Sequence, residues 1–179
     1  MNILKIVFAC VAIIIAIPFF IALFVKNEYI VEREITIDKP QAEIFNYIKL
    51  LRNQDNYNQW MMVDPNAKKV YTGTDGTEGF TIAWDSENKN LGKGEQVIKK
   101  IHEGKGVDLE IRFIKPFENV AQTPISTDAI TPTQTKVKWT FSGRNKYPMN
   151  LMNLFIDKML GKDLATSLGN LKSNLEQHH

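Results

Sequence analysis

Residues 148–172 read PMNLMNLFIDKMLGKDLATSLGNLK, and this stretch decides the fold. Its first half is apolar around most of a helical circumference, whereas its second half repeats leucine along one narrow helical stripe. Gly161 separates the two halves, and a single glycine is tolerated inside a helix. The apolar positions are Leu151, Met152, Phe155, Ile156, Met159 and Leu160 in the first half, and Leu164, Leu168, Leu171 and Leu175 in the second. The pattern predicts one long amphipathic helix that packs across a sheet.

The residues before this helix predict the sheet. Residues 107–113 (VDLEIRF) and 137–141 (VKWTF) alternate between apolar and polar side chains. Such alternation is typical of antiparallel strands with one solvated and one covered face. Clusters of Gly, Asn, Asp or Pro separate further segments of this kind. The predicted strands of this region are 67–71, 80–84, 93–102, 107–114, 119–125 and 135–141.

One more strand and one more helix come first in the domain. Residues 29–37 alternate as a half-buried strand does. Asp38 suits a helix N-cap and Pro40 the first helical turn, which predicts a helix over residues 40–52. The order strand, helix, six strands and long helix predicts an α+β fold in which a strongly curved antiparallel sheet wraps around the C-terminal helix.

A hydrophobic segment precedes this domain. Residues 6–25 read IVFACVAIIIAIPFFIALFV and carry no charge. A helix of that length spans about 30 Å, the thickness of a bilayer hydrocarbon core. A cleaved signal peptide would have a shorter apolar core and small residues at its cleavage site, but residues 23–26 read LFVK. We therefore expect residues 1–28 to be a transmembrane anchor and residues 29–179 a single globular domain.

The flanks of the anchor bear on its orientation. Lys5 lies before the apolar run, while Lys26 and Arg33 follow it among several glutamates. The positive-inside rule decides little between such similar flanks. Because the N-terminal tail is short, we expect it to lie inside and the domain outside, in a single-pass protein of a bacterial cell membrane.

Composition narrows the function classes. Twenty-two Lys and Arg residues against 20 Asp and Glu give a net charge of +2, too mild for the cationic surface that nucleic acid requires. The single cysteine, Cys10, rules out a disulfide framework and a thiolate zinc cluster. His102, the one histidine before the terminal pair, lies next to a predicted turn, where a solvated side chain is the simpler interpretation. We expect no metal site, no cofactor and no nucleic-acid partner.

Several motifs resemble a known group of proteins. The whole order of elements resembles the helix-grip fold of the START-like superfamily, which includes the Bet v 1-like proteins. The closer resemblance is to bacterial SRPBCC proteins of the polyketide cyclase/dehydrase type, members of which also carry a hydrophobic N-terminal segment. The similar segments are VEREITI (31–37), Lys39-Pro40 with Ile44-Phe45, Trp60-Met61, DPNA (64–67), Tyr71-Thr72-Gly73, Gly92-Lys93-Gly94 and residues 148–172. Tyr57 departs from the pattern, because a tryptophan is common in this region of the subgroup.

The resemblance implies a cavity between the sheet and the C-terminal helix that holds a small hydrophobic molecule or lipid. Trp84, Phe113 and Trp139 fall on inward strand faces, and Trp60 begins the segment that crosses the domain. We interpret Met152, Phe155 and Met159 as the opposite wall, since flexible thioethers adapt to irregular ligands. Core packing is the simpler role for the aromatic residues and an equally physical one for the methionines.

Arg33 is the charged candidate. Its position in the alternation places it beside Val31 and Ile35, where an unpaired guanidinium would be costly. Either Arg33 serves a cavity, or it lies at the rim of the sheet and meets water or a carboxylate, which is the simpler interpretation. Asp157 and Lys158 point about 100° apart on a helix and are interpreted as flanks of the apolar stripe.

Three functions remain open. The first is a membrane-anchored domain that binds a small hydrophobic molecule or lipid, and it is the one we favour. The second is a cyclase-like enzyme that uses polar cavity groups such as Arg33, although no catalytic residue can be assigned and no nucleophilic constellation is visible. The third is an interaction module whose surface meets another membrane protein, and the sequence does not name that partner.

Overall fold

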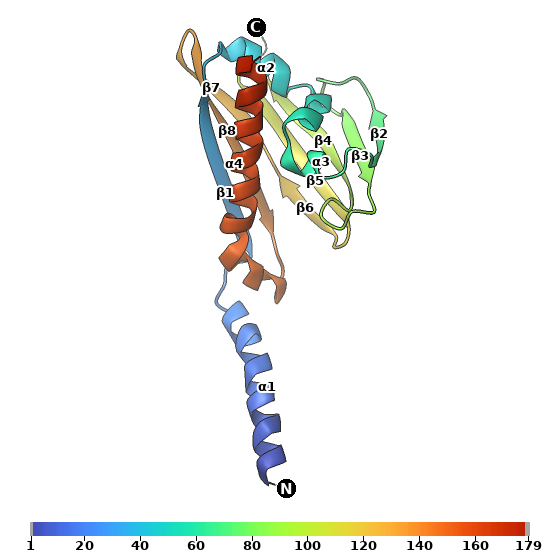
Figure 1. Cartoon of the computed structure of the whole chain (residues 1–179), viewed down its shortest axis with the longest axis vertical. Helices are drawn as coiled ribbons and strands as arrows, with labels where there is room; N and C mark the ends of the chain where they lie inside the picture. Colours follow the sequence, from blue (N-terminus) through green and yellow to red (C-terminus); the bar gives the residue numbers. More distant parts are fainter. Residues whose placement is uncertain (1, 178–179) are drawn as a thin grey trace.

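A single long helix leads into the domain. The computed structural model describes residues 2–177, and helix α1 (Asn2–Ala22) projects away from the rest of the chain (Figure 1). The part Lys5–Ala22 is long and apolar enough to cross a membrane, a property that signal sequences share. Nearly all of its described side chains are exposed, so α1 is not a core helix of the domain.

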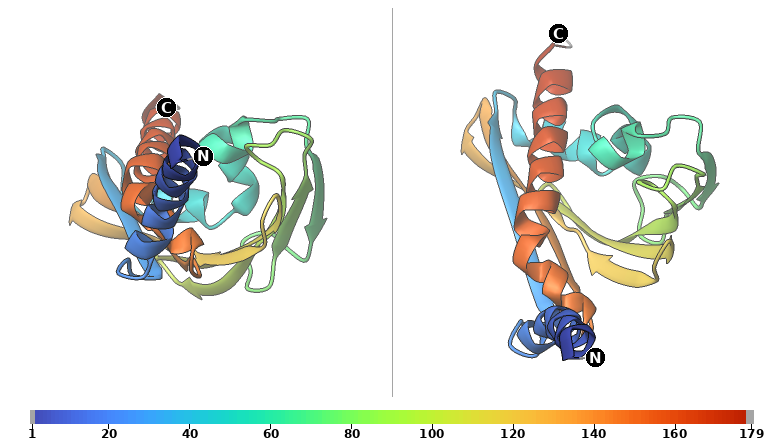
Figure 2. Two further views of the ribbon diagram at one scale, coloured as in Figure 1. Left: turned by 90° about the horizontal axis from the view of Figure 1, so that it is seen from below. Right: turned by 60° about the horizontal axis from the view of Figure 1, so that its bottom comes forward.

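The domain contains one eight-stranded, wholly antiparallel sheet. Its strand order is β1-β8-β6-β5-β4-β3-β2, and β7 pairs with β5 and β8. The strands are β1 (Glu28–Ile37), β2 (Lys68–Thr72), β3 (Thr81–Asp85), β4 (Lys93–His102), β5 (Gly106–Lys115), β6 (Asn119–Gln122), β7 (Ile125–Thr131) and β8 (Gln134–Arg144). The views in Figure 2 show that the sheet curls strongly, with β2 and β3 turned toward the side on which the helices lie. The predicted α+β helix-grip architecture is thereby confirmed.

The strand prediction was wrong between residues 119 and 131. The single strand expected over 119–125 is two strands, β6 and β7, and the second of them was not predicted at all. Pro124 lies at the break, where it cannot donate a ladder hydrogen bond. Polar residues along β7 hid its alternation, in which Ile125 and Thr127 are buried.

The helices differ from the prediction at one break. The helix expected over 40–52 is divided into α2 (Gln41–Ile48) and the 3₁₀ helix η1 (Leu51–Asn56). The Asp75 carboxylate accepts hydrogen bonds from the backbone N–H groups of Leu51 (2.8 Å) and Arg52 (3.2 Å), which replaces the helical bonding there. The remaining helices are α3 (Gln59–Met62), the 3₁₀ helix η2 (Met149–Met152) and α4 (Asn153–Gln177).

Helix α4 and the sheet enclose the core. Leu164, Leu168, Leu171 and Leu175 are buried, as the leucine stripe predicts. Helix α4 lies along β1, while α2, η1 and α3 lie on the open side of the curled sheet (Figures 1 and 2). This arrangement leaves the inward residues of β3, β4, β5 and β8 facing the helices.

Candidate functional site

A cluster of aromatic rings lies on the inner side of the sheet around Phe141 of β8. The Phe141 ring contacts those of Tyr29, Trp60 and Phe113, with centroid separations of 6.5, 5.9 and 6.4 Å. Trp60 and Phe113 are half-buried, whereas Phe141 is buried. The structure therefore brings together two of the predicted site residues, Trp60 and Phe113, and leaves each of them partly exposed.

Local hydrogen bonds position Trp60. The side chain of Asn58 caps α3 by accepting a bond from the Trp60 backbone N–H at 3.1 Å. The backbone N–H of Gln59 donates to Ser167 Oγ on α4 at 2.9 Å. The N-terminal end of this four-residue helix is thus held both by its own cap and by α4, and the Trp60 indole packs against Phe141 of the sheet.

Trp84 and Trp139 pack as core residues. Each indole N–H has a partner within the domain, Leu91 O for Trp84 and Thr123 Oγ1 for Trp139, the latter at 2.7 Å. The Trp84 ring lies so close to Gly94 that a Cβ there would be 2.6 Å from it. With Trp139 only 1% exposed, these two rings form the floor of the inner face, consistent with the core-packing interpretation.

Met152, Phe155 and Met159 do not lie opposite these tryptophans. All three are exposed, Phe155 by 62%; Met152 ends η2, and Phe155 and Met159 lie in the first half of α4. The expectation that they form the second wall is therefore corrected. The inward positions of this half are the half-buried Ile156 and Leu160, which pack against the core.

An ion pair sets the rotation of this half of α4. Both Nη atoms of Arg33 on β1 donate to the Asp157 carboxylate at 3.0 Å, a bidentate pair. These hydrogen bonds, with the nearby charge, hold the pKa of Asp157 below its ordinary value. Asp157 thus faces the sheet edge, and Met159, two residues further, points to the opposite side.

Arg33 accordingly lies at the rim and meets a carboxylate, as the simpler of its two interpretations expects. A Cβ at position 161 would lie 1.9 Å from Arg33 Nη2, so Gly161 makes room for the guanidinium. Sequence reasoning missed Asp157 as the partner, because 124 residues separate the two side chains. The sequence did contain one sign of this pair, since Gly161 follows Asp157 by one helical turn and leaves space for a large side chain beside it.

Buried polar groups inside the domain were also missed. Gln96 of β4 is fully buried, and neither atom of its amide has a hydrogen-bond partner among the described residues. The hydroxyl of Tyr57 and Nε2 of Gln54 are buried without a partner in the same way. The signal for Gln96 was its inward position in β4, between Gly94 and Ile98.

Tyr57 occupies the position at which the resemblance showed a departure. Its ring contacts those of Trp139 and Tyr47, with centroid separations of 5.9 and 6.1 Å. Burial, with a smaller contribution from Tyr47, raises the pKa of the Tyr57 phenol above its ordinary value. The phenol therefore remains a neutral hydrogen-bonding group at any physiological pH.

The polar side chains that are buried inside the domain are neutral. Among the described residues, the buried polar side chains are amides and hydroxyls, and no Asp, Glu, Lys or Arg is buried with them. Within residues 2–177, no group of three or more His, Cys, Asp or Glu side chains could hold a metal ion. The interior can donate and accept hydrogen bonds, and it offers no charge to a bound molecule.

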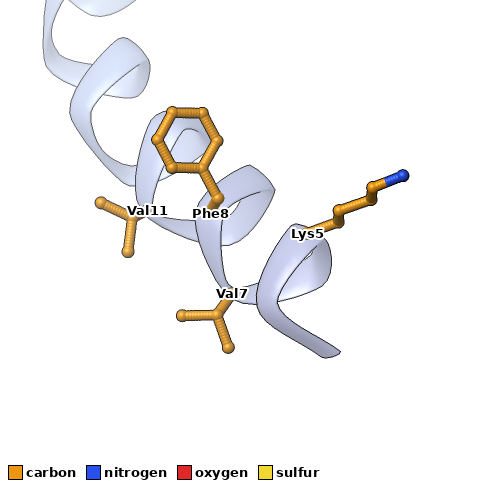
Figure 3. A pocket seen from close by; sticks show the side chains of 4 residues that line it. All are labelled: Lys5, Val7, Phe8 and Val11. Atoms are coloured by element: carbon orange, nitrogen blue, oxygen red, sulfur yellow. The ribbon is translucent and has the colours of Figure 1, made fainter. Parts of the chain in front are cut away.

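Two surface depressions lie away from this interior. Figure 3 shows an open one on α1, lined by Lys5, Val7, Phe8 and Val11, which would face lipid if α1 crosses a membrane. The second is a groove of about 370 Å³ between α2, η1 and the end of α4. It is lined by Glu43, Asn46, Tyr47, Leu50, Asn53, Asn174 and Leu175. Neither depression contains a residue of the aromatic cluster.

Comparisons with known proteins agree with this architecture. The family model described as "Polyketide cyclase / dehydrase and lipid transport" matches residues 29–176. A truncated norcoclaurine synthase from Thalictrum flavum superposes with a TM-score of 0.63 at 10% identity, over 87% of this chain and 98% of the other. Ara h 8.0201 superposes with a TM-score of 0.60 at 15% identity, over 84% of this chain and 99% of the other. The Aha1 dimer from Colwellia psychrerythraea superposes with a TM-score of 0.55 at 18% identity, over 83% of this chain and 96% of the other. A search of curated proteins finds no match.

Proposed function

We propose that this chain, which belongs to the polyketide cyclase/dehydrase and lipid transport family, binds a small hydrophobic molecule or lipid between its curled sheet and its helices while α1 anchors it in a membrane. The domain would lie on the outer side of that membrane. The bound molecule would carry an uncharged polar group, such as a hydroxyl or carbonyl, at one end of an apolar body.

The observation that carries the proposal is the unpartnered amide of Gln96. Leaving a buried amide without hydrogen bonds costs about 1 to 3 kcal/mol, and most buried polar groups in proteins are paired. A ligand hydroxyl could both donate to and accept from this amide. Because no charged side chain is buried among the described residues, a carboxylate or ammonium would have no counter-charge there.

The half-buried aromatic residues suggest how the ligand would be held. Trp60 and Phe113 present accessible ring surface, and Trp84 and Trp139 form a rigid floor beneath. Ile156 and Leu160 of α4 complete an apolar surround from the helix side. Ligand sites in proteins commonly combine such apolar walls with a few polar groups.

Tryptophan fluorescence tests the proposal directly. Trp60, Trp84 and Trp139 are the only tryptophans of the chain, and α1 contains none of them. The full chain in lipid nanodiscs is titrated with ω-bromoundecanol, whose bromine quenches tryptophan on contact. We expect saturable quenching that unbrominated undecanol reverses, and weaker quenching by the charged ω-bromoundecanoate.

The Gln96→Leu variant sharpens the same experiment. Loss of about 1 kcal/mol of hydrogen bonding should weaken the alcohol about fivefold and leave ω-bromoundecane unaffected. Quenching that rises without saturation and is not reversed by undecanol would report partition into the bilayer alone. That result would overturn the proposal.

The cyclase-like alternative gains nothing from Arg33, because both Nη atoms already bond Asp157 at the rim. The interaction-module alternative is favoured by the exposed apolar side chains of Met152 at the end of η2 and of Phe155 and Met159 on α4. In that case α4 itself would be the contact surface, and a bound apolar probe would leave the association unchanged.

A further inference from the structure

The end of α1 is fastened to the domain by two asparagine side chains. Nδ2 of Asn150 donates to the carbonyls of Ala22 (2.7 Å) and Val25 (2.8 Å). Nδ2 of Asn153 donates to the carbonyls of residues 26 and 27, at 2.8 and 2.9 Å. Of these four carbonyls, only that of Ala22 belongs to α1, whose last carbonyls have no partner within the helix. The other three belong to the short segment that leads to β1. Helix α1 is therefore capped by the domain itself.

Further amide bonds extend this attachment into the sheet. The backbone N–H of Asn145 donates to Asn27 O at 2.9 Å, and its side chain donates to Asn153 Oδ1 at 2.8 Å. Asn119, the first residue of β6, donates to Asn145 Oδ1 at 3.1 Å. Bonds from η2, from the first residue of α4, from Asn145 just after β8 and from β6 thus converge on the exit of α1, and they fix which end of the domain faces α1.

Large apolar side chains are exposed around this attachment. Phe24 is 76% exposed just beyond α1, and Tyr147, Met149 and Met152 are exposed beside Asn150. Phe117, in the turn between β5 and β6, is 73% exposed. That turn directly precedes Asn119, so it lies at the same end of the sheet. We call these five side chains the anchor-side surface.

Lysines are more numerous than carboxylates near this surface, where Glu118 lies beside Phe117. Lys26 and Lys146 are exposed and form no ion pair with any described residue, whereas Arg144 pairs with Glu28 at 3.4 Å. Tyrosine is enriched where a membrane span meets the headgroup layer, and long lysine side chains near the end of a span extend toward that layer. That layer is roughly 5 to 8 Å thick on each side of the hydrocarbon core.

We propose that the anchor-side surface lies in the headgroup layer of the same bilayer that α1 crosses, so that the domain rests on the membrane instead of being tethered above it. The inference depends on the proposed membrane span of α1. We choose lipid as the partner of this surface because the surface is continuous with α1. Asn150 bonds the last turn of α1 directly, and Met149 and Met152 belong to the same short helix as Asn150. An apolar surface joined to a span in this way meets lipid before any other partner.

Site-directed fluorescence tests this contact in the full chain. Cys10, the only cysteine, is replaced by alanine, and single cysteines are introduced as Phe117→Cys, Met149→Cys or Ile130→Cys. Ile130 is the matched control, an exposed apolar side chain near the end of β7. The strand registers place this end of β7 beside Ile37 and Thr135, at the end of the sheet opposite to Glu28 and Arg144. Each variant carries an environment-sensitive fluorophore and is reconstituted at one copy per nanodisc, with lipids that bear a nitroxide near the headgroup.

We expect blue-shifted emission and nitroxide quenching at positions 117 and 149, and neither effect at position 130. Solvent-like emission at 117 and 149 in protein that remains in the disc would overturn the proposed surface while leaving the anchor intact. A blue shift that occurs only at two copies per disc would assign the surface to a second chain and would also overturn it. Protein that never enters the disc would refute the proposed membrane span of α1, and with it the membrane contact of this surface. Failure of ligand binding in the interior would not change the emission or the quenching at these positions, so the two proposals fail separately.

Discussion

At the scale of single residues, the stability of a Gln96 variant tests whether the buried amide lacks a partner, as the proposed ligand site requires. Replacing it by leucine removes the unpartnered amide and keeps the volume similar. We expect Gln96→Leu to raise the free energy of unfolding of delipidated protein by about 1 to 3 kcal/mol. Denaturant midpoints of the full chain in detergent measure this.

A matched control exists on β6. Gln122 is exposed, and its side chain donates to Glu110 at 3.0 Å, so Gln122→Leu should give no stabilisation. If Gln96→Leu lowered the midpoint instead, the Gln96 amide would have a partner in solution, and the argument for a polar ligand group would fail.

The Arg33–Asp157 pair predicts a pH dependence. Because the folded-state pKa of Asp157 is lowered, the pair contributes stability above the ordinary carboxyl pKa of about 4 and loses it as the pH falls through the lower folded value. We expect the difference in unfolding midpoint between wild type and Asp157→Asn to be present at pH 6 and to vanish at low pH.

The control for this series is Asp128→Asn, which removes one exposed negative charge on β7. Both side chains of the Arg33 pair are partly or largely exposed, so the effect should be small, as surface ion pairs usually are. A midpoint difference for Asp157→Asn that is constant from pH 2 to pH 6 would contradict the role of the ion pair.

At the scale of elements, the two halves of α4 show what the sequence can predict. The stripe from Leu164 to Leu175 is narrow, so it has only one face that a sheet can bury, and this half was predicted correctly. The first half is apolar on nearly every side, and no face is distinguished by the pattern. Its rotation is set by Asp157 and Arg33, a contact between distant segments that periodicity does not encode.

The candidate site was predictable only in part for the same reason. Aromatic residues on inward strand positions were recognisable by their period, and Trp60 and Phe113 do meet at Phe141. The buried polar groups were overlooked because a glutamine in an alternating strand is ordinarily assigned to the wet face. Which face of β4 is covered depends on the curl of the whole sheet, a property of the assembled fold.

Loss of the Asn150 hydrogen bonds at the end of α1 should change the local dynamics of the segment after α1 more than the stability of the domain. Asn150→Ala leaves the carbonyls of Ala22 and Val25 without their donor, so the segment between α1 and β1 should open more often. We expect faster amide hydrogen exchange in residues 23–29 and an unchanged unfolding midpoint of the domain.

Asn174→Ala is the control, since its side chain makes a similar 2.8 Å bond to Asn56 O near the far end of α4. It should leave exchange in residues 23–29 as it is in wild type. Equal exchange in both variants would show that the Asn150 bonds do not hold α1 on the domain.

At the scale of the whole molecule, the proposed membrane span and the proposed ligand-binding domain are separate parts of the chain. The core consists of the sheet, α2, η1, α3 and α4, and α1 contributes only Ala22 to the buried apolar set of the described residues. The proposed interior and the proposed membrane contact thus depend on one domain, and α1 determines only where that domain lies. Exchange of a ligand with the same bilayer would then require no diffusion through water.

The last prediction follows from this division. Deletion of residues 1–24 removes the apolar helix and keeps the carbonyls of residues 25, 26 and 27, which Asn150 and Asn153 bond. Because the core cluster of the domain contains no residue before Tyr29, the shortened chain should be soluble and should unfold cooperatively at the denaturant midpoint of the full chain. Circular dichroism during urea titration measures this, and size-exclusion chromatography reports association through the exposed anchor-side surface. A gradual transition without a cooperative midpoint would show that α1 is part of the folding unit, and the chain would then be one structural body instead of a domain on an anchor.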